Sequence, residues 1–359
     1  MHPTTRILVS NIALPTKTIG SWTTRLSQFI ERNPSCFDII LSPEHKGNAN
    51  IYCKKRKFFT WKKRLRHIQL LKWVAADYIK HIKKLSTVNK HLTIIVMDDP
   101  HLLEAITLIK QQLTCTIDLI FSFHGFKLQL RPDILNATDK ILFLSHTGLG
   151  TSKAAYNSFP NSVVVGNAVD SKVFYPLKIT EFIEQRHRLG YTVSDEILIW
   201  LANDRPKKGF DIFKKVSLTL LEEYKNLKVL IIGSRQTINH TNVKSIGRIA
   251  NSDVAKYLQI GNYYMFTTRY NEGFGLSMIE ALKCGNMVIA SHRGAIAEVL
   301  GDLPNTYLVD TIDDKNAWVE TFKRAKSNAA LAESRITREE SEAMYNYKTW
   351  ETKFLNAIS

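Results

Sequence analysis

Short, nearly continuous apolar runs alternate with stretches of helical spacing along the 359-residue chain. The first two runs are Arg6–Ser10 and Cys36–Leu41, and the stretch between them, Trp22–Arg32, carries apolar residues three or four positions apart. Strands that are covered on both faces are apolar throughout, and their alternation with helices is typical of parallel sheets. The pattern therefore predicts an α/β fold with helices on both faces of parallel sheets.

The same rhythm occurs in both halves of the chain, which predicts two doubly wound domains joined near residues 167–178. In the first half we expect further strands at residues 92–97, 117–121, 140–144 and 162–165, and a helix at 101–112. In the second half we expect strands at residues 196–201, 227–232, 262–267 and 286–290, and helices at 209–224, 253–258, 276–284 and 314–327. Ligands of such sheets bind beyond the carboxyl ends of the strands.

The chain is strongly basic, with 49 Lys and Arg against 33 Asp and Glu, a formal charge of +16. Such a charge favours phosphate-bearing partners: nucleic acid, a membrane or a small anionic ligand. The four cysteines form no CxxC pair, which argues against a metal knuckle or a disulfide framework and favours a reducing compartment. We find no apolar window long enough to span a bilayer and no signal peptide in residues 1–10. We therefore expect a cytoplasmic protein, on the inner face of the membrane.

Residues 46–90 hold most of the charge, with 14 Lys and Arg against the single acid Asp77. Apolar residues recur every three or four positions from Trp61 to Leu85, which predicts one long amphipathic helix. The apolar stripe is interpreted as core, with a solvated basic face. The start of the helix, including Lys62, Lys63 and Arg64, is a candidate contact for an anionic membrane or acceptor. Nucleic acid is the alternative partner, although no recognition motif accompanies the patch.

The densest motif is the glycine-rich segment Tyr270–Gly285, which follows a predicted strand and enters a helix. Gly273 and Gly275 allow a ligand to approach the backbone, and the amides at the helix start point toward an anion such as a diphosphate. Carboxylates accept hydrogen bonds from sugar hydroxyls, so Glu272 in the loop and Glu280 in the helix are candidate donor-binding residues. The alternative is a strand–loop–helix turn with two surface glutamates.

A second motif, Trp200–Asp211, places the cations Arg205, Lys207 and Lys208 in a strand-to-helix loop. Cations at this sheet edge neutralise the charge of a diphosphate leaving group. The alternative is a solvated lysine-rich turn.

Together these residues resemble the retaining glycosyltransferases of the GT-B fold, family 4 (glycosyl transferases group 1), and in particular those of the lipopolysaccharide core and of cell-surface polysaccharides. The matches are the Glu-x7-Glu pair Glu272 and Glu280, Lys208-Gly209, Ser245–Ile249, Val288–Ser291 with Gly294–Glu298, Asn167–Asp170 with Phe174, and the final segment Tyr345–Phe354. One departure is Asn203, which stands where the family's phosphate loop has arginine.

The resemblance implies two doubly wound domains facing a cleft: an N-terminal acceptor domain of residues 1–170, joined by a returning helix at 340–359, and a nucleotide-sugar domain of residues 171–339. It implies catalytic roles for Glu272, His124 and Lys208. It implies donor contacts from Glu280, Arg205, Lys208, Gly273, Phe274, Gly275, Leu276, Gly20, Arg248 and Ile249. Asp98 and Asp99 are weaker acceptor candidates, or cap the helix that follows them.

The implied reaction moves a sugar from a nucleotide diphosphosugar, with UDP favoured, to a hydroxyl of a membrane-associated or anionic glycan or lipid acceptor, with retention and without a metal or other cofactor. A GDP-mannose-type mannosyltransferase of the same fold is the first alternative. A nucleic-acid-binding protein that uses residues 46–90 is the alternative of another class, although we expect no nucleic-acid partner.

Overall fold

The computed structural model describes residues 4–15, 21–44, 47, 49–56, 67–331 and 336–359. The chain divides into two compact units. Unit 1 comprises Met1–Gly166 with Glu351–Ser359, and unit 2 comprises Asn167–Trp350. The boundaries between the units thus lie after residues 166 and 350, whereas the sequence predicted domain boundaries after residues 170 and 339.

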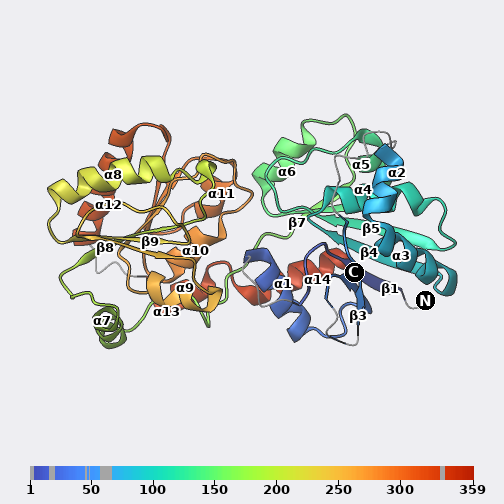
Figure 1. Ribbon diagram of the computed structural model, residues 1–359, viewed down its shortest axis with the longest axis horizontal. Helices are drawn as coiled ribbons and strands as arrows, with labels where there is room; N and C mark the ends of the chain where they lie inside the picture. Colours follow the sequence, from blue (N-terminus) through green and yellow to red (C-terminus); the bar gives the residue numbers. More distant parts are fainter. Residues whose placement is uncertain (1–3, 16–20, 45–46, 48, 57–66, 332–335) are drawn as a thin grey trace. The chain divides into compact units, whose positions relative to one another are not determined.

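Unit 1 contains a parallel sheet of seven strands in the order β3-β2-β1-β4-β5-β6-β7 (Figure 1). Its strands are β1 Thr5–Val9, β2 Ile39–Ser42, β3 Asn50–Tyr52, β4 His91–Met97, β5 Thr116–Ser122, β6 Lys140–Phe143 and β7 Asn161–Val164. Its helices are α1 Ser21–Arg32, α2 His67–Val74, α3 Ala76–Val88, α4 Pro100–Lys110, α5 Pro132–Ala137, α6 His146–Lys153 and, from Glu351 on, α14 Tyr347–Ile358.

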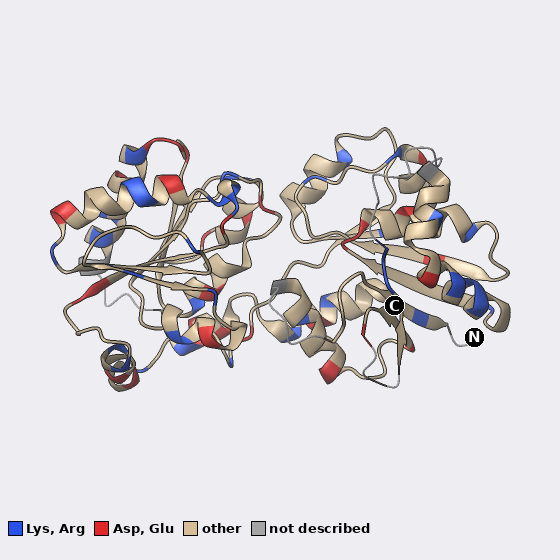
Figure 2. Cartoon of the chain, viewed as in Figure 1, with Lys and Arg blue, Asp and Glu red and all other residues tan. Residues whose placement is uncertain are grey.

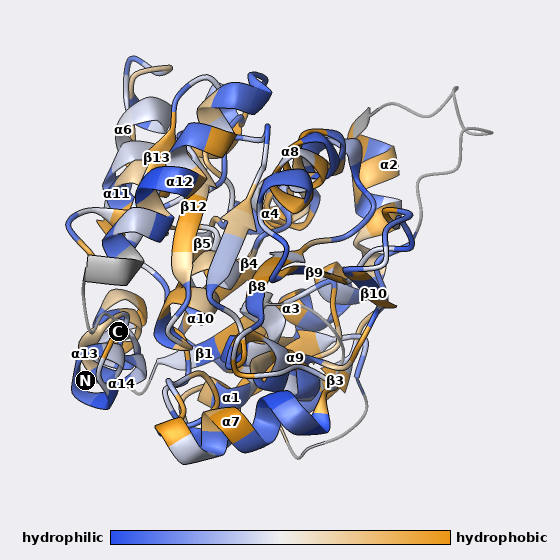
Figure 3. Ribbon diagram, turned by 90° about the vertical axis from the view of Figure 1, so that its left-hand side faces the viewer, coloured by the Kyte–Doolittle hydropathy of each residue, from blue (hydrophilic) through white to orange (hydrophobic). Residues whose placement is uncertain are grey.

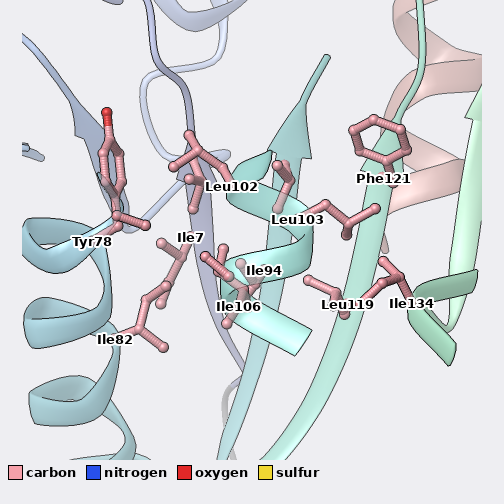
Figure 4. Packing of buried hydrophobic residues seen from close by; sticks show 14 of the residues in the cluster. Ile7, Tyr78, Ile82, Ile94, Leu102, Leu103, Ile106, Leu119, Phe121 and Ile134 are labelled. Atoms are coloured by element: carbon pink, nitrogen blue, oxygen red, sulfur yellow. The ribbon is translucent and has the colours of Figure 1, made fainter. Parts of the chain in front are cut away.

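Helices cover both faces of this sheet. On one face Ile7, Ile94 and Leu119 of neighbouring strands pack against Ile82 of α3 and Ile106 of α4 (Figure 4). On the other face α1 and α14 lie side by side (Figure 1), and the rings of Phe29 and Phe354 meet edge to face at 5.1 Å. Each such fully buried apolar side chain contributes roughly 1.5–3 kcal/mol to folding.

The single long helix expected from Trp61 to Leu85 is wrong for its described part, because α2 and α3 are separated at Ala75. At this break the carbonyl of Val74, the last residue of α2, accepts a hydrogen bond from the Arg56 N–H at 3.0 Å. Leu71, Tyr78 and Ile82 of the apolar stripe are buried, as the core interpretation predicted, whereas Ile68 of the same stripe is 47% exposed.

Unit 2 contains a parallel sheet of six strands in the order β10-β9-β8-β11-β12-β13. Its strands are β8 Glu196–Leu201, β9 Leu227–Ile232, β10 Val243–Gly247, β11 Tyr263–Phe266, β12 Met287–Ser291 and β13 Thr306–Val309. Its helices are α7 Ile179–Arg188, η2 Pro206–Lys208 (a 3₁₀ turn), α8 Phe210–Glu223, α9 Asn251–Leu258, α10 Leu276–Lys283, α11 Ile296–Leu300, α12 Lys315–Leu331 and α13 Arg338–Ala343.

The core of unit 2 follows from the same alternation. Strand β12 is hydrophobic over its first four positions (Figure 3) and is buried at each of its five positions. Helices α8 and α12 cover one face of the sheet (Figure 1), where Trp200 stacks on Phe213 and Trp318 is fully buried. The expected fold class, two doubly wound parallel-sheet domains with a helical C-terminus, is confirmed.

Each sheet reverses its strand order once, and the two reversals are equivalent. In unit 1 the reversal lies between β1 and β4, and in unit 2 it lies between β8 and β11. Open α/β sheets bind ligands at such switch points, just beyond the carboxyl ends of the strands. The loops that follow these four strands are therefore the first places to look for a site.

Candidate active site

The loop after β8 carries Lys208 in a fixed conformation. Gly209, which follows it, has φ +72°, and a Cβ atom there would lie 2.0 Å from the Thr267 carbonyl oxygen. Only glycine fits this backbone and this approach. Thr267 in turn donates its hydroxyl to the carbonyls of Lys208 and Gly209 at 3.0 Å each. The two loops of the switch point are thus joined at the base of the Lys208 side chain.

Lys208 and Glu272 meet at this switch point. The Lys208 Nζ atom lies 2.6 Å from Glu272 Oε1, and the Thr268 hydroxyl donates to the same oxygen at 3.1 Å. The two charged side chains are 20% and 14% exposed, so solvent screens them only in part. The structure therefore brings together two residues that the sequence placed in separate motifs 64 positions apart.

The loop after β12 supports the Glu272 backbone from behind. Gly294 has φ +63°, and a Cβ atom there would lie 2.5 Å from both the N and the O atoms of Glu272. The Ala295 N–H donates to the Glu272 carbonyl at 2.9 Å, and the Ser291 hydroxyl donates to the Thr268 carbonyl at 2.7 Å. The sequence matched Gly294 to the family motif but did not assign it this supporting contact.

Arg269 holds the same loop from the side, and the sequence reasoning missed it. Its guanidinium donates to both carboxylate oxygens of Asp211, at 2.5 and 2.8 Å, and to Asp313 at 2.7 Å. Asp211 lies in the first turn of α8, so this bidentate pair ties the Lys208 loop to the Glu272 loop. Arg269 is 58 positions from Asp211 and 44 from Asp313, so the three residues form no local motif and only the fold brings them together.

The start of α10 offers free backbone donors beside this pair. Gly275 has φ +86° and precedes the helix without a capping side chain. The N–H groups of Gly275, Leu276 and Ser277 meet no acceptor within the part of the chain that the structure describes. Such amides at a helix N-terminus bind anions. Phe274, which precedes them, is buried and anchors the loop.

Glu280 lies one turn into α10 and is largely buried. Burial raises the pKa of its carboxyl from 4.5 to about 7. No donor among the described residues reaches this carboxylate, although Tyr264 lies close enough for the charge of Glu280 to raise the pKa of its hydroxyl further. A buried acid without a donor has unused hydrogen-bonding capacity for a ligand hydroxyl.

Other predicted donor residues of unit 2 surround this edge. Arg205 is exposed in the loop after β8, and Lys207 lies 3.7 Å from the centre of the Tyr270 ring. Arg248 is exposed and Ile249 partly buried just beyond β10. We therefore find these residues on loops that follow β8, β10 and β11, at the carboxyl edge of one sheet.

In unit 1 His124 follows β5 at the same edge of its own sheet. Its Nε2 atom lies 3.1 Å from the Ser122 hydroxyl, and its Nδ1 atom is buried without a hydrogen-bond partner among the described residues. Burial, assisted by the charge of Arg25, holds the pKa of His124 well below 6.5. The imidazole is therefore neutral at physiological pH. The Trp22 ring meets it edge to face at 5.1 Å.

Asp98 and Asp99 end β4 but differ in their surroundings. Asp98 has φ +43° and accepts the His124 N–H at 2.9 Å, while burial raises the pKa of its carboxyl to about 6. Asp99 accepts the N–H groups of His101 and Leu102, and its other oxygen pairs with Lys55 and Asn11. Asp99 thus caps α4, which is one of the two roles that the sequence left open.

Several predicted contacts lie outside the described residues: Gly20, Lys62, Lys63 and Arg64. Of the basic segment, the described part includes the exposed lysines 80, 83 and 84 of α3 (Figure 2). Over the described ranges, no helix has the length and apolar character that crossing a membrane requires. The same ranges hold no cluster of three His, Cys, Asp or Glu side chains that would bind a metal ion.

Solved structures of similar shape cover nearly the whole chain. Sucrose-phosphate synthase from Thermosynechococcus elongatus aligns with a TM-score of 0.74 and 16% identity, over 98% of this chain and 97% of the other. Anabaena Alr3699/HepE in complex with UDP and glucose aligns with a TM-score of 0.72 and 12% identity, over 99% of each chain. At these identities the likeness establishes the GT-B fold and leaves the activity open.

Sequence comparisons point to the same family. A mannosyltransferase of Corynebacterium glutamicum, GDP-mannose-dependent and acting on a monoacylated phosphatidylinositol monomannoside, is 27% identical over 48% of each chain. The lipopolysaccharide core mannosyltransferase LpsB of Rhizobium meliloti is 29% identical, over 46% of this chain and 51% of its own. The chain thus spans about half the length of these relatives. Residues 181–343 match the family model of the glycosyl transferases group 1, the family that the resemblance predicted.

Proposed function

We propose that the protein transfers a sugar from a nucleotide diphosphosugar to an acceptor hydroxyl. The observation that carries the proposal is the Lys208–Glu272 pair at 2.6 Å, together with the amides at the start of α10, which meet no acceptor among the described residues. The diphosphate binds between the Lys208 ammonium and these amides, which stabilise the negative charge of the leaving group. An ammonium has three donors, so Lys208 can contact Glu272 and a phosphate oxygen together.

The remaining residues orient the donor. Glu280 accepts hydrogen bonds from the ribose hydroxyls, and Glu272 accepts them from the transferred sugar. His124, neutral because of its burial, offers a ring nitrogen to the donor sugar. We propose transfer with retention, in which a phosphate oxygen of the leaving group takes the acceptor proton, so no general base is assigned. Cations and helix amides fill the role that a metal ion has in other transferases.

Donor and acceptor are narrower proposals. UDP-sugars are favoured by the Ala202–Gly209 loop, which resembles that of lipopolysaccharide-core glucosyltransferases. GDP-mannose is the second candidate, because a curated relative is a GDP-mannose-dependent enzyme. The formal charge of +16 favours an anionic or membrane-borne glycan or lipid acceptor, reached from the cytoplasmic face of the membrane.

The test measures transfer and nucleotide binding together. Wild-type protein is incubated with UDP-, GDP- and ADP-sugars and a lipid-linked oligosaccharide fraction, and thermal shifts identify the nucleotide that binds. Lys208→Ala and Glu280→Ala should each reduce transfer about 10²–10³-fold while the circular dichroism spectrum is unchanged. Rates near that of the wild type in both variants would refute the site. Band shifts with RNA or DNA at physiological salt, without nucleotide-sugar binding, would favour the nucleic-acid alternative.

A further inference from the structure

The chain passes between the two units twice, and both passages are fastened together within unit 2. The Val169 N–H, just after the first passage, donates to the Tyr345 carbonyl, just before the second, at 3.2 Å. Arg338 of α13 reaches the first passage as well, with its guanidinium 3.8 Å from the Tyr175 ring centre. We name residues 341–345, the end of α13 and the two residues that follow it, the return segment.

Lys283 fastens the return segment to α10, the helix that carries Glu280. Its side chain is fully buried, and its ammonium donates to the carbonyls of Ser341 and, at 2.7 Å, Met344. The Ser341 hydroxyl donates back to the Lys283 carbonyl at 3.1 Å. Burial lowers the pKa of Lys283 to about 8. A methionine of similar length would avoid this desolvation cost but would leave both carbonyls without this donor, so the ammonium satisfies two acceptors at a buried site.

Tyr345 fastens the same segment to the Glu272 loop. Its ring meets Phe274 edge to face at 5.0 Å, and its hydroxyl donates to the Val299 carbonyl of α11 at 2.6 Å. Its φ is +43°, which costs a non-glycine residue about 1–2 kcal/mol. Two unfavourable features, a buried charge and a strained backbone, thus occur at the points where the return segment contacts the nucleotide-binding elements. Strain of this kind is often retained at functional sites.

We propose that Lys283 and Tyr345 are positioning residues that couple the nucleotide site to the return segment. The proposal rests on the function proposed above. We assign neither residue a direct contact with the donor. Lys283 fixes α10, and Tyr345 fixes the loop through Phe274, so nucleotide binding orders the return segment and an altered return segment weakens nucleotide binding. Coupling between sites is reciprocal, so both effects have the same magnitude.

The test compares Lys283→Met and Tyr345→Ala with Lys326→Met. Lys326 is a partly buried lysine of the same unit that pairs with Glu196 on β8, outside the nucleotide site. Calorimetric titration with UDP, GDP and ADP gives affinities, and amide hydrogen exchange follows residues 338–350. We expect nucleotide to slow exchange of 338–350 in the wild type. We expect Lys283→Met, which leaves two carbonyls without this donor, to lower the melting temperature and to weaken nucleotide binding about five- to tenfold. Lys326→Met should lower stability and leave affinity unchanged.

The possible outcomes separate the two proposals. If the wild type binds no nucleotide, the proposed function fails. If it binds nucleotide while exchange of 338–350 is unchanged, or if Lys283→Met binds as tightly as the wild type, only the coupling is overturned. A variant Tyr345→Phe, which keeps the ring contact with Phe274, should recover most of the affinity lost in Tyr345→Ala, and its failure to do so would contradict the role of the ring.

Discussion

The two switch points have the same topology but opposite chemistry. In unit 2, Lys208 and Glu272 face each other across the reversal, beside helix amides that have no acceptor among the described residues. In unit 1, Asn11 and Asp99 span the equivalent reversal at 2.6 Å, but Asp99 is already occupied by four donors. Topology selects where a site is possible, and we infer from the unsatisfied polar groups that the unit 2 edge is the candidate site for the diphosphate.

The largest expected change in the free energy of unfolding tests how closely the loops after β8 and β11 pack in unit 2. Gly209→Ala would place a Cβ atom 2.0 Å from the Thr267 carbonyl, in a left-handed conformation, and should cost about 3–5 kcal/mol of the free energy of unfolding. Gly190→Ala is the matched control: its φ is +85° but no atom lies within 4 Å of the added Cβ, so it should cost about 1 kcal/mol. Urea unfolding measures both. Equal costs would contradict the close joining of the two loops.

An intermediate effect concerns the buried acid of α10. Because the native pKa of Glu280 is about 7 against 4.5 in the unfolded chain, the native state holds a proton that the unfolded state has lost between these pH values. The free energy of unfolding should therefore fall as pH rises through this window. In Glu280→Gln this decrease in the free energy of unfolding should be smaller by about 2–3 kcal/mol. The variant should therefore be more stable than the wild type at pH 8 but not at pH 4.5.

The control for Glu280→Gln is Glu222→Gln, an exposed carboxylate on α8. Unfolding curves at pH 4.5, 6, 7 and 8 give the slopes of both variants. The same slope in Glu280→Gln and in the wild type would show that this carboxyl is not desolvated, and its assigned contact with ribose would lose its physical basis. Nucleotide affinity, measured on the same samples, should fall in Glu280→Gln because a carboxamide accepts fewer hydrogen bonds.

The smallest expected effect on nucleotide affinity concerns Asp99, at the switch point of unit 1. Asp99→Ala removes the cap of α4 and the partner of Lys55, and should lower the free energy of unfolding by about 2–4 kcal/mol. Nucleotide affinity should stay within twofold of the wild type, because the Asp99 oxygens are occupied within unit 1. A large loss of nucleotide affinity in Asp99→Ala would mean that both switch points bind the donor.

The sequence predicted most of the fold because the deciding signals are local. Continuous apolar runs located ten of the strands, whereas the short edge strands β3, β10 and β13, of three to five residues, were missed. Lys208, Glu272 and Glu280 could be selected as candidates because each belongs to a contiguous motif. Other contacts join residues that lie 44 to 58 positions apart. They are the hydrogen bonds of Arg269 to Asp211 and Asp313, and that of Lys283 to Ser341. No local pattern encodes those contacts, and only the folded chain reveals them.

The central claim is that Lys208 and the amides of α10 bind a diphosphate. Its most direct test is calorimetric titration of the nucleoside diphosphate that binds, and of the matching monophosphate, into wild-type protein and Lys208→Met. We expect the wild type to bind the diphosphate at least about tenfold more tightly than the monophosphate. In Lys208→Met most of this difference in affinity should be lost. An undiminished gain in Lys208→Met would contradict the claim, because the second phosphate would then be bound elsewhere.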